Sequence, residues 1–195
     1  ALEDYARFKA EDSLPADSKE ITLGDQDLFK LLIGDRVLKK DLKSSTGKIA
    51  LYSANVFHPM GYLEQSNIQD FTKPSILWGI DGNFELRNIP PGEKFATTDN
   101  CGTIQILSDK IVPEYLLYAI YLRKEEESFD RSFRASLSNI SRFTVTIPVD
   151  KNSDFDVQIQ REIATQFITM QQKKENLARL KAQLDNSLNR YLHIT

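Results

Sequence analysis

The sequence is poor in cysteine, histidine and long apolar runs, and each shortage excludes a class of protein. The single Cys101 cannot form an internal disulfide, and no apolar run approaches the roughly 18 residues that span a bilayer. No cationic segment followed by an apolar stretch opens the chain, so we expect no secretory signal. Together these absences predict a cytoplasmic protein.

Side chains suited to catalysis or metal binding are also scarce. His58 and His193 are the only imidazoles, neither has metal-ligand spacing, and Cys101 has no second cysteine. No glycine-rich phosphate loop occurs. Residues 88–92, Asn-Ile-Pro-Pro-Gly, are interpreted as a turn and not as the Asn-Pro-Pro-aromatic motif of amino-methyltransferases, because the isoleucine interrupts that motif and a glycine replaces its ring. We therefore predict no catalytic residue and no metal site in this chain.

The composition allows one folded domain with an extension, since 41% of the 195 residues are hydrophobic and 10% are aromatic. Residues 1–19 are predicted to be a short helix or a linker that ends near Pro15. Residues 20–150 are predicted to form a β-rich domain, and residues 151–195 a long helix. The expected fold class is α+β.

The β-rich domain is predicted from short apolar runs that are separated by turns such as Asp81-Gly82-Asn83. One helix is expected at residues 112–124, because Pro113 suits a first helical position and an apolar face follows it. Trp78 lies inside an apolar run and is expected in the core. The expected strands are residues 48–53, 74–80, 102–107 and 143–148.

The C-terminal segment has neither proline nor glycine after Pro148, which predicts one long helix over residues 157–192. Such a helix would be about 54 Å long, so its far half cannot bury an apolar seam on its own domain and needs a partner helix. Lys174 and Lys181 interrupt the seam, which is compatible with an acidic partner or with a bundle of more than two helices. The predicted partner-helix residues are Ile163, Phe167, Met170, Leu177, Leu184, Leu188 and Tyr191.

The charge distribution is uneven although the net charge is only −3. The first 20 residues hold six acids and three bases, which accounts for the whole net charge, so the rest of the chain is neutral. Residues 36–48 hold five bases and one acid, with serine, threonine and glycine between them. This segment is a candidate for phosphate contact, although a run of charge can equally be an ordinary solvated surface.

A series of short motifs precedes and enters the predicted helix. The motifs are Ile21-Thr22-Leu23-Gly24-Asp25, Ile33-Gly34-Asp35-Arg36, the run from Ser75 to Phe84, the run from Phe95 to Gly102, the run from Phe133 to Ile140, Val145-Thr146-Ile147-Pro148, Phe155-Asp156 and Gln160-x-x-Ile163-Ala164. Their order resembles the target-recognition domain of a type I restriction-modification specificity subunit, and the resemblance covers about residues 20–195.

The resemblance implies a non-catalytic DNA-recognition component that reads one half of a bipartite site. Loops of the β-rich part would enter the major groove, and the long helix would pack against a second such helix, as a homodimer or with another specificity half. The implied partners are double-stranded DNA, methyltransferase subunits and, in restriction complexes, the motor-nuclease subunit. Adenine methylation and S-adenosylmethionine would belong to the methyltransferase partner, so no cofactor is expected on this chain.

The family usually has two recognition domains and two long helices, whereas this sequence has one of each. The chain is therefore a half-subunit that dimerises, a fragment of a longer specificity subunit, or the C-terminal recognition domain of a fused adenine methyltransferase.

Candidate DNA-binding residues fall into two groups, because lysine, arginine and serine hold phosphates while groove-facing side chains read base edges. The base-reading segment at 129–142 concentrates guanidinium and amide donors, and its arginines could instead pair with the glutamates at 125–127. The phosphate candidates are Arg36, Lys39, Lys40, Lys43, Ser45 and Lys48. The base-reading candidates are Arg131, Arg134, Ser138, Asn139 and Arg142, with Asn83, Phe84 and Asn100 as weaker ones.

Two other functions remain open from the sequence. A coiled-coil adaptor whose β-rich domain binds protein would agree with the neutral charge of that domain. An enzyme in its own right would be established by methylation or cleavage by the purified chain alone.

Overall fold

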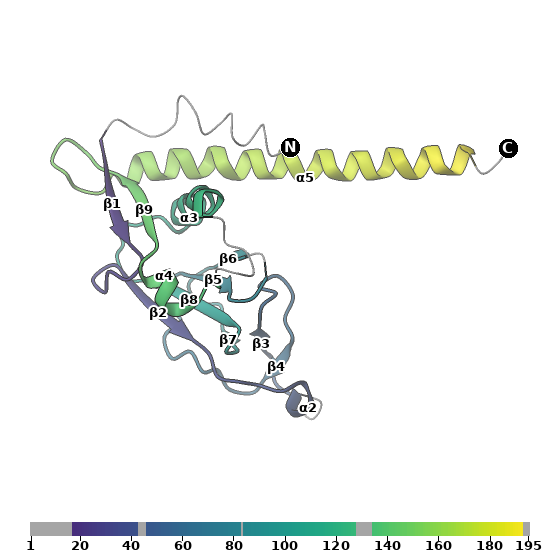
Figure 1. Cartoon of the computed structure of the whole chain (residues 1–195), viewed down its shortest axis with the longest axis horizontal. Helices are drawn as coiled ribbons and strands as arrows, with labels where there is room; N and C mark the ends of the chain where they lie inside the picture. The colour runs from purple at the N-terminus through teal and green to yellow at the C-terminus, as the bar shows by residue number, and fades with distance from the viewer. Residues whose placement is uncertain (1–16, 43–45, 83, 128–133, 193–195) are drawn as a thin grey trace.

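The computed structural model describes residues 17–42, 46–82, 84–127 and 134–192. These residues form a β-rich domain of three small sheets, with helices on one side and one helix that projects far beyond the domain (Figure 1). The predicted α+β class with a long C-terminal helix is confirmed. The predicted helix or linker at residues 1–19 lies almost wholly outside the described residues.

A four-stranded antiparallel sheet in the order β2-β8-β5-β6 is the centre of the domain. Every residue of β5 and β8 is buried, because these two strands lie inside the sheet and are covered on both faces. The strands are β2 (Phe29–Ile33), β8 (Cys101–Ile106), β5 (Ser75–Gly79) and β6 (Leu86–Ile89). Trp78 has no exposed surface, which confirms it as a core residue.

A second sheet, in the order β4-β3-β7, packs against the first. Its strands are β4 (Gly61–Leu63), β3 (Ile49–Tyr52) and β7 (Phe95–Thr97), and β3 runs parallel to β7. Apolar side chains from both sheets, including Leu77, Ile89 and Phe95, form a small core between them. The short helix α2 (Lys39–Leu42) lies beside this sheet, at the end of the domain farthest from the long helix (Figure 1).

The third sheet pairs β1 (Ser18–Thr22) with β9 (Thr144–Pro148), which closes the domain where the long helix begins. Helix α3 (Pro113–Glu127) packs between β9, β6 and the long helix α5 (Val157–Leu192). The five-residue α4 (Leu137–Ser141) lies against β2. The predicted strands and both predicted helices are therefore present, with Pro113 as the first residue of α3 as expected.

Helix α5 has two unlike halves. Near its start, Ile163, Ala164 and Phe167 are at most 7% exposed and pack on α3, where the ring of Phe167 lies 5.2 Å from that of Tyr118. The prediction that Ile163 and Phe167 contact a partner helix is therefore wrong, because α3 of the same chain covers them, and it also covers part of Met170. No described helix is long and apolar enough to cross a membrane.

The far half of α5 leaves its domain and carries an uncovered apolar stripe. Leu177, Leu180, Leu184 and Leu188 are 67%, 56%, 60% and 51% exposed. They recur at three- or four-residue intervals, so they lie on one face of the helix. The expectation that this half cannot bury its seam on its own domain is thus confirmed, and Leu180 belongs to the stripe although the sequence analysis left it out. The side chain of Tyr191 lies outside the described part.

Candidate nucleic-acid interface

Polar side chains from distant parts of the chain meet on one exposed surface beside the C-terminal ends of β5 and β7. Asp81 follows β5, Asn100 precedes β8, and Arg134 enters the segment that leads into α4. The sequence analysis named Arg134 and Asn100 separately, and the fold brings them together. Asp81, which lies at their centre, was missed, because nothing local distinguishes a carboxylate in a turn from an ordinary turn residue.

Asp81 fixes the guanidinium of Arg134. The Nε of Arg134 donates to Oδ1 of Asp81 at 2.9 Å and its Nη2 donates to Oδ2 at 3.4 Å, so both carboxylate oxygens are engaged. The two side chains are 58% and 51% exposed, and an ion pair so open to water contributes little to stability. Its effect is geometric, because the pair restricts the rotamers of Arg134, whose Nη2 also donates to Oδ1 of Asn100 at 3.5 Å. The expected alternative, a contact with the glutamates at 125–127, concerns side chains that lie outside the described residues.

A buried tryptophan holds the segment in place. Nε1 of Trp78 donates to the backbone carbonyl of Ala135 at 2.8 Å, and Ala135 is itself 3% exposed. Ser136 then caps α4, its hydroxyl accepting from the backbone N–H of Asn139. The residue that carries the exposed guanidinium is therefore directly followed by a buried, hydrogen-bonded one.

Asn139 and Arg142 make internal hydrogen bonds within the same segment. Nδ2 of Asn139 donates to the carbonyl of Arg134 at 2.8 Å, and its Oδ1 accepts from Nη2 of Arg142 at 3.0 Å. Nε of Arg142 donates to the carbonyl of Ser138, whose hydroxyl lies 3.1 Å from that of Ser136. One N–H and one lone pair of the Asn139 amide remain for a base. In this conformation the other two positions of the amide hold Arg134 and Arg142 in place.

A loop that the sequence analysis did not select borders the same surface. Oδ1 of Asn55 accepts from the backbone N–H groups of Phe57 and His58, which is an Asx turn that fixes the loop. Phe57 is 48% exposed, and the loop is attached to the turn before Asn100 by a 3.0 Å hydrogen bond between the Ser53 and Thr98 hydroxyls. In the sequence, the signal for this turn is an asparagine, Asn55, two residues before the aromatic Phe57.

The prediction that Phe84 contacts bases is wrong. Phe84 is 1% exposed and packs against Phe143 with ring centroids 6.1 Å apart, because the positive φ of 49° at this residue turns its ring into the core. Neighbouring Asn83 lies outside the described residues.

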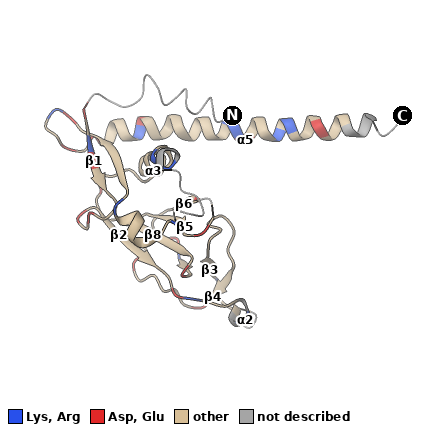
Figure 2. Cartoon of the chain, in the orientation of Figure 1, with Lys and Arg blue, Asp and Glu red and all other residues tan. Residues whose placement is uncertain are grey.

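The phosphate candidates form an arm that leads away from this surface. Asp35 pairs with Thr98 in a parallel bridge, so exposed Arg36 starts beside the turn that carries Asn100. Exposed Lys40 and Lys48 lie at the opposite end of the arm, on and after α2. Figure 2 shows acids and bases interspersed over the described chain, so this interface would rest on a few placed cations and not on one broad basic face. Lys43, Ser45 and Arg131 lie outside the described residues, as does the side chain of Lys39.

Burial in the core shifts the pKa of two side chains of the domain, Cys101 and Tyr115. Burial raises the pKa of the Cys101 thiol to about 12 and raises that of the Tyr115 hydroxyl as well. A thiol in that state is protonated at neutral pH and is a poor nucleophile. In the described part of the chain, no group of three or more histidine, cysteine or acidic residues is placed to hold a metal.

The fold and the surface together define a protein module of a particular kind, a recognition domain mounted on a long helix. The chain belongs to the family of the type I restriction modification DNA specificity domain, whose model matches residues 15–186. It is 34% identical over 88 residues to a Mycoplasma pneumoniae protein assigned as a type I specificity subunit, which covers 45% of this chain and 24% of that protein.

Solved structures have the same fold at low sequence identity. The S subunit of a type I restriction-modification system from M. genitalium matches with a TM-score of 0.59 at 20% identity over 88% of this chain. The HsdS subunit of Thermoanaerobacter tengcongensis matches with a TM-score of 0.63 at 12% identity over 87% of the chain. This chain spans 44% and 41% of these two proteins, so it corresponds to less than half of each.

Proposed function

We propose that this chain is a non-catalytic DNA-reading component of a type I restriction-modification methyltransferase complex, and that it recognises one half of a bipartite site. The observation that carries the proposal is the convergence of Asp81, Asn100, Arg134 and Asn139 from distant segments onto one exposed surface. Membership of a DNA specificity family supports it. The stability of the core does not depend on this exposed arginine. Its orientation by two carboxylate oxygens, next to a segment held by a buried tryptophan, therefore favours a role in binding.

Arginine is suited to read guanine, because its guanidinium can donate two hydrogen bonds to O6 and N7 in the major groove. Asp81 accepts from Nε and Nη2 of Arg134, and Asn100 accepts from Nη2 at 3.5 Å, so the guanidinium is held in one orientation. A two-bond guanine contact through Nη1 and Nη2 would replace the long bond from Nη2 to Asn100. The carboxylate of Asp81 can itself accept a hydrogen bond from the amino group of cytosine. The arm from Arg36 to Lys48 would then contact phosphates and set the position of the domain on the duplex.

The leucine stripe on the far half of α5 is the proposed site of association. Its partner would be the corresponding helix of a second copy, or of a further specificity segment. Adenine methylation, S-adenosylmethionine binding and any DNA cleavage would belong to separate methyltransferase and restriction subunits. The same interface would serve if the chain were the recognition domain of a fused methyltransferase.

The test is selection of bound sequences from a random duplex pool, with the purified methyltransferase present. Arg134→Ala should change the selected bases and weaken the preferred site by about 5- to 150-fold, corresponding to roughly 1–3 kcal/mol. Lys40→Ala should weaken all sequences alike and reduce the salt slope of log K by about 1.

The matched control is Arg179→Ala, which removes the same charge from an exposed position on α5 far from the surface. An Arg134→Ala protein that selects the same bases with the same affinity as the parent would remove Arg134 from the reading surface. Absence of duplex binding by the parent protein at low salt would favour a protein-binding adaptor instead.

A further inference from the structure

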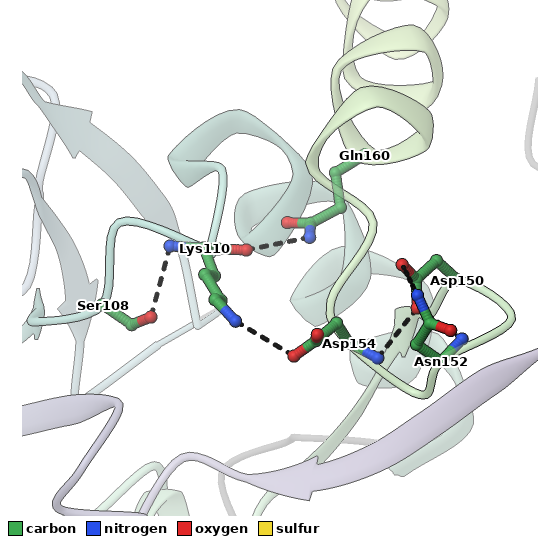
Figure 3. A network of polar contacts seen from close by, with 6 residues as sticks. All are labelled: Ser108, Lys110, Asp150, Asn152, Asp154 and Gln160. Atoms are coloured by element: carbon green, nitrogen blue, oxygen red, sulfur yellow. Dashed lines mark hydrogen bonds and ion pairs between the residues drawn. The ribbon is translucent and has the colours of Figure 1, made fainter.

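A buried glutamine joins the long helix to the recognition domain. Gln160 lies in the first turn of α5 and has no exposed surface. Its Oε1 accepts from the backbone N–H of Val112 at 2.9 Å. Its Nε2 donates to the backbone carbonyl of Lys110 at 3.0 Å, the bond that Figure 3 shows. One side chain therefore satisfies a backbone donor and a backbone acceptor of the same loop.

That loop connects the central sheet to the helices. It leaves the end of β8, the strand that Asn100 precedes, and it enters α3 at Pro113. The two bonds of Gln160 thus link the base of α5 to the central sheet through only a few residues of backbone.

The other contacts at this junction constrain the helix less. Apolar packing of Ile163 and Phe167 on α3 is not directional and tolerates small rotations and shifts. The Lys110–Asp154 ion pair is 3.0 Å long, but its side chains are 55% and 65% exposed, so water competes with it. The Asp156 carboxylate caps α5 by accepting from the N–H of Ile159, which fixes where the helix starts but not where it points. A backbone bond from the N–H of Asp156 to the carbonyl of Pro148, 2.9 Å long, also joins the start of the helix to β9, but it lies before the first turn. Gln160 adds a buried side-chain contact from within the helix, and a wrong helix direction would leave two backbone groups without partners.

The length of α5 turns a small error in angle into a large displacement. From Gln160 to Leu192 the helix is about 48 Å long, so a tilt of about 10° moves its far end by roughly 8 Å. This displacement is larger than two base-pair steps, each of which is about 3.4 Å. A loosely hinged helix could therefore not hold two recognition domains at one fixed separation on DNA.

We propose that Gln160 is a positioning residue that fixes the direction of α5 relative to the recognition domain and thereby sets the gap length that the assembled protein accepts between half-sites. The second part of this inference rests on the proposed function, whereas the first part does not.

The direction of the helix can be measured without DNA. Spin labels are attached at Lys94→Cys in the domain and Ala182→Cys on α5, two exposed positions, while the buried Cys101 stays unlabelled. Dilution with unlabelled protein leaves only distances within one chain. The parent should give one narrow distance distribution, and Gln160→Met, which keeps the volume but removes both hydrogen bonds, should broaden it at least twofold. Gln166→Ala, an exposed glutamine on the same helix, should leave it unchanged.

Gln160→Ala is the second variant and should broaden the distance distribution as well. If Gln160→Ala does not fold, the distribution of Gln160→Met alone tests the inference. An equally narrow distribution at the same distance in a folded Gln160→Met protein overturns the inference.

The gap is measured on duplexes that carry both half-sites at the native separation and at one or two base pairs more or less. The parent complex should methylate only the native gap, and Gln160→Met should raise the relative rate on the shifted gaps at least fivefold without changing the half-site bases. Broadened distances with an unchanged gap preference would overturn the link to spacing and leave the DNA-reading proposal intact. If the parent protein bound no duplex, that result would count against the proposed function. The spin-label distances would still test whether Gln160 fixes the direction of α5.

Discussion

Trp78 connects the buried core with the exposed recognition segment. Its ring packs so closely on β8 that a Cβ added at Gly102 would lie 2.1 Å from a ring carbon, which explains the glycine at that position. Its indole N–H leaves the core to bind the carbonyl of Ala135, one residue after Arg134. A change in packing at this ring is therefore expected to alter the orientation of Arg134.

Cys101 makes the stability of the domain dependent on pH in the alkaline range. Burial raises the pKa of its thiol to about 12 in the folded chain, whereas an exposed thiol has a pKa of about 8.5. Between these values the unfolded chain has lost a proton that the folded chain retains, so the free energy of unfolding falls as pH rises, by at most about 1.4 kcal/mol per pH unit. Below pH of about 8 this contribution is fully present.

Urea unfolding at pH 7.5, 9 and 10 checks this expectation. The parent should lose stability over that range more steeply than Cys101→Ala, in which the titrating group is gone, although the alanine variant starts less stable because of the small cavity. Equal pH dependence in the two proteins would show that Cys101 does not contribute. Tyr115 shifts in the same direction and remains in both proteins, so the comparison isolates the thiol.

Among the elements, α5 combines two tasks along one helix. Phe167→Ala should destabilise the domain by about 3–5 kcal/mol, because it removes a ring that is 4% exposed and packed on α3. Leu184→Ala changes a side chain that is 60% exposed in the single chain, so it should change the stability of the dilute monomer by less than about 0.5 kcal/mol. The same change should weaken association through the leucine stripe.

Denaturant unfolding at low protein concentration and analytical ultracentrifugation at high concentration separate these two effects. Leu184→Ala should lower the fraction of associated protein and leave the unfolding midpoint of the monomer in place. Thr169→Ala, an exposed change on the same helix outside the stripe, serves as the control. A Leu184→Ala protein that associates as strongly as the parent would exclude the stripe as the contact.

The division of α5 also shows where sequence reasoning succeeded and where it could not. The absence of proline and glycine, together with apolar residues at heptad spacing, predicted the helix from 157 to 192, since both features are local. The same spacing assigned Ile163 and Phe167 to the seam for a partner, because periodicity says that a face is apolar and not what covers it. Helix α3 follows β8 in the chain and packs on the first turns of α5. This tertiary contact covers the base of α5, and the rest of the helix stays exposed.

In the candidate interface, too, the sequence predicted local features and missed those that depend on long-range contacts. Arg134 and Asn139 could be selected from their own segment, because it concentrates donors outside any apolar pattern. Asp81 could not, since its place beside Arg134 depends on the long-range pairing of β5 with β8. The Asn55 loop has a local turn signal, but its place at this surface depends on the pairing of β3 with β7. Phe84 was misjudged because one backbone torsion decides whether a ring at a turn points into water or into the core.

At the level of the whole molecule, one recognition surface is a weak reader. A single bidentate base contact discriminates by only about 1–3 kcal/mol, and the described domain offers few such contacts. Doubling the surface through the bare half of α5 would join two weak contacts into one selective complex.

The symmetry of the assembly predicts the form of the DNA site. If two copies pair through the leucine stripe, a two-fold axis relates their reading surfaces, so the site should consist of two short identical half-sites in inverted orientation with a gap of fixed length. If the second helix belongs to a different specificity segment, the two half-sites should differ while the gap stays fixed. Mapping methylated adenines in the source genome, with and without this gene, distinguishes these forms directly. A short continuous motif whose methylation depends on the gene would contradict both, because it would need only one recognition domain and would leave the exposed half of α5 without a role in spacing.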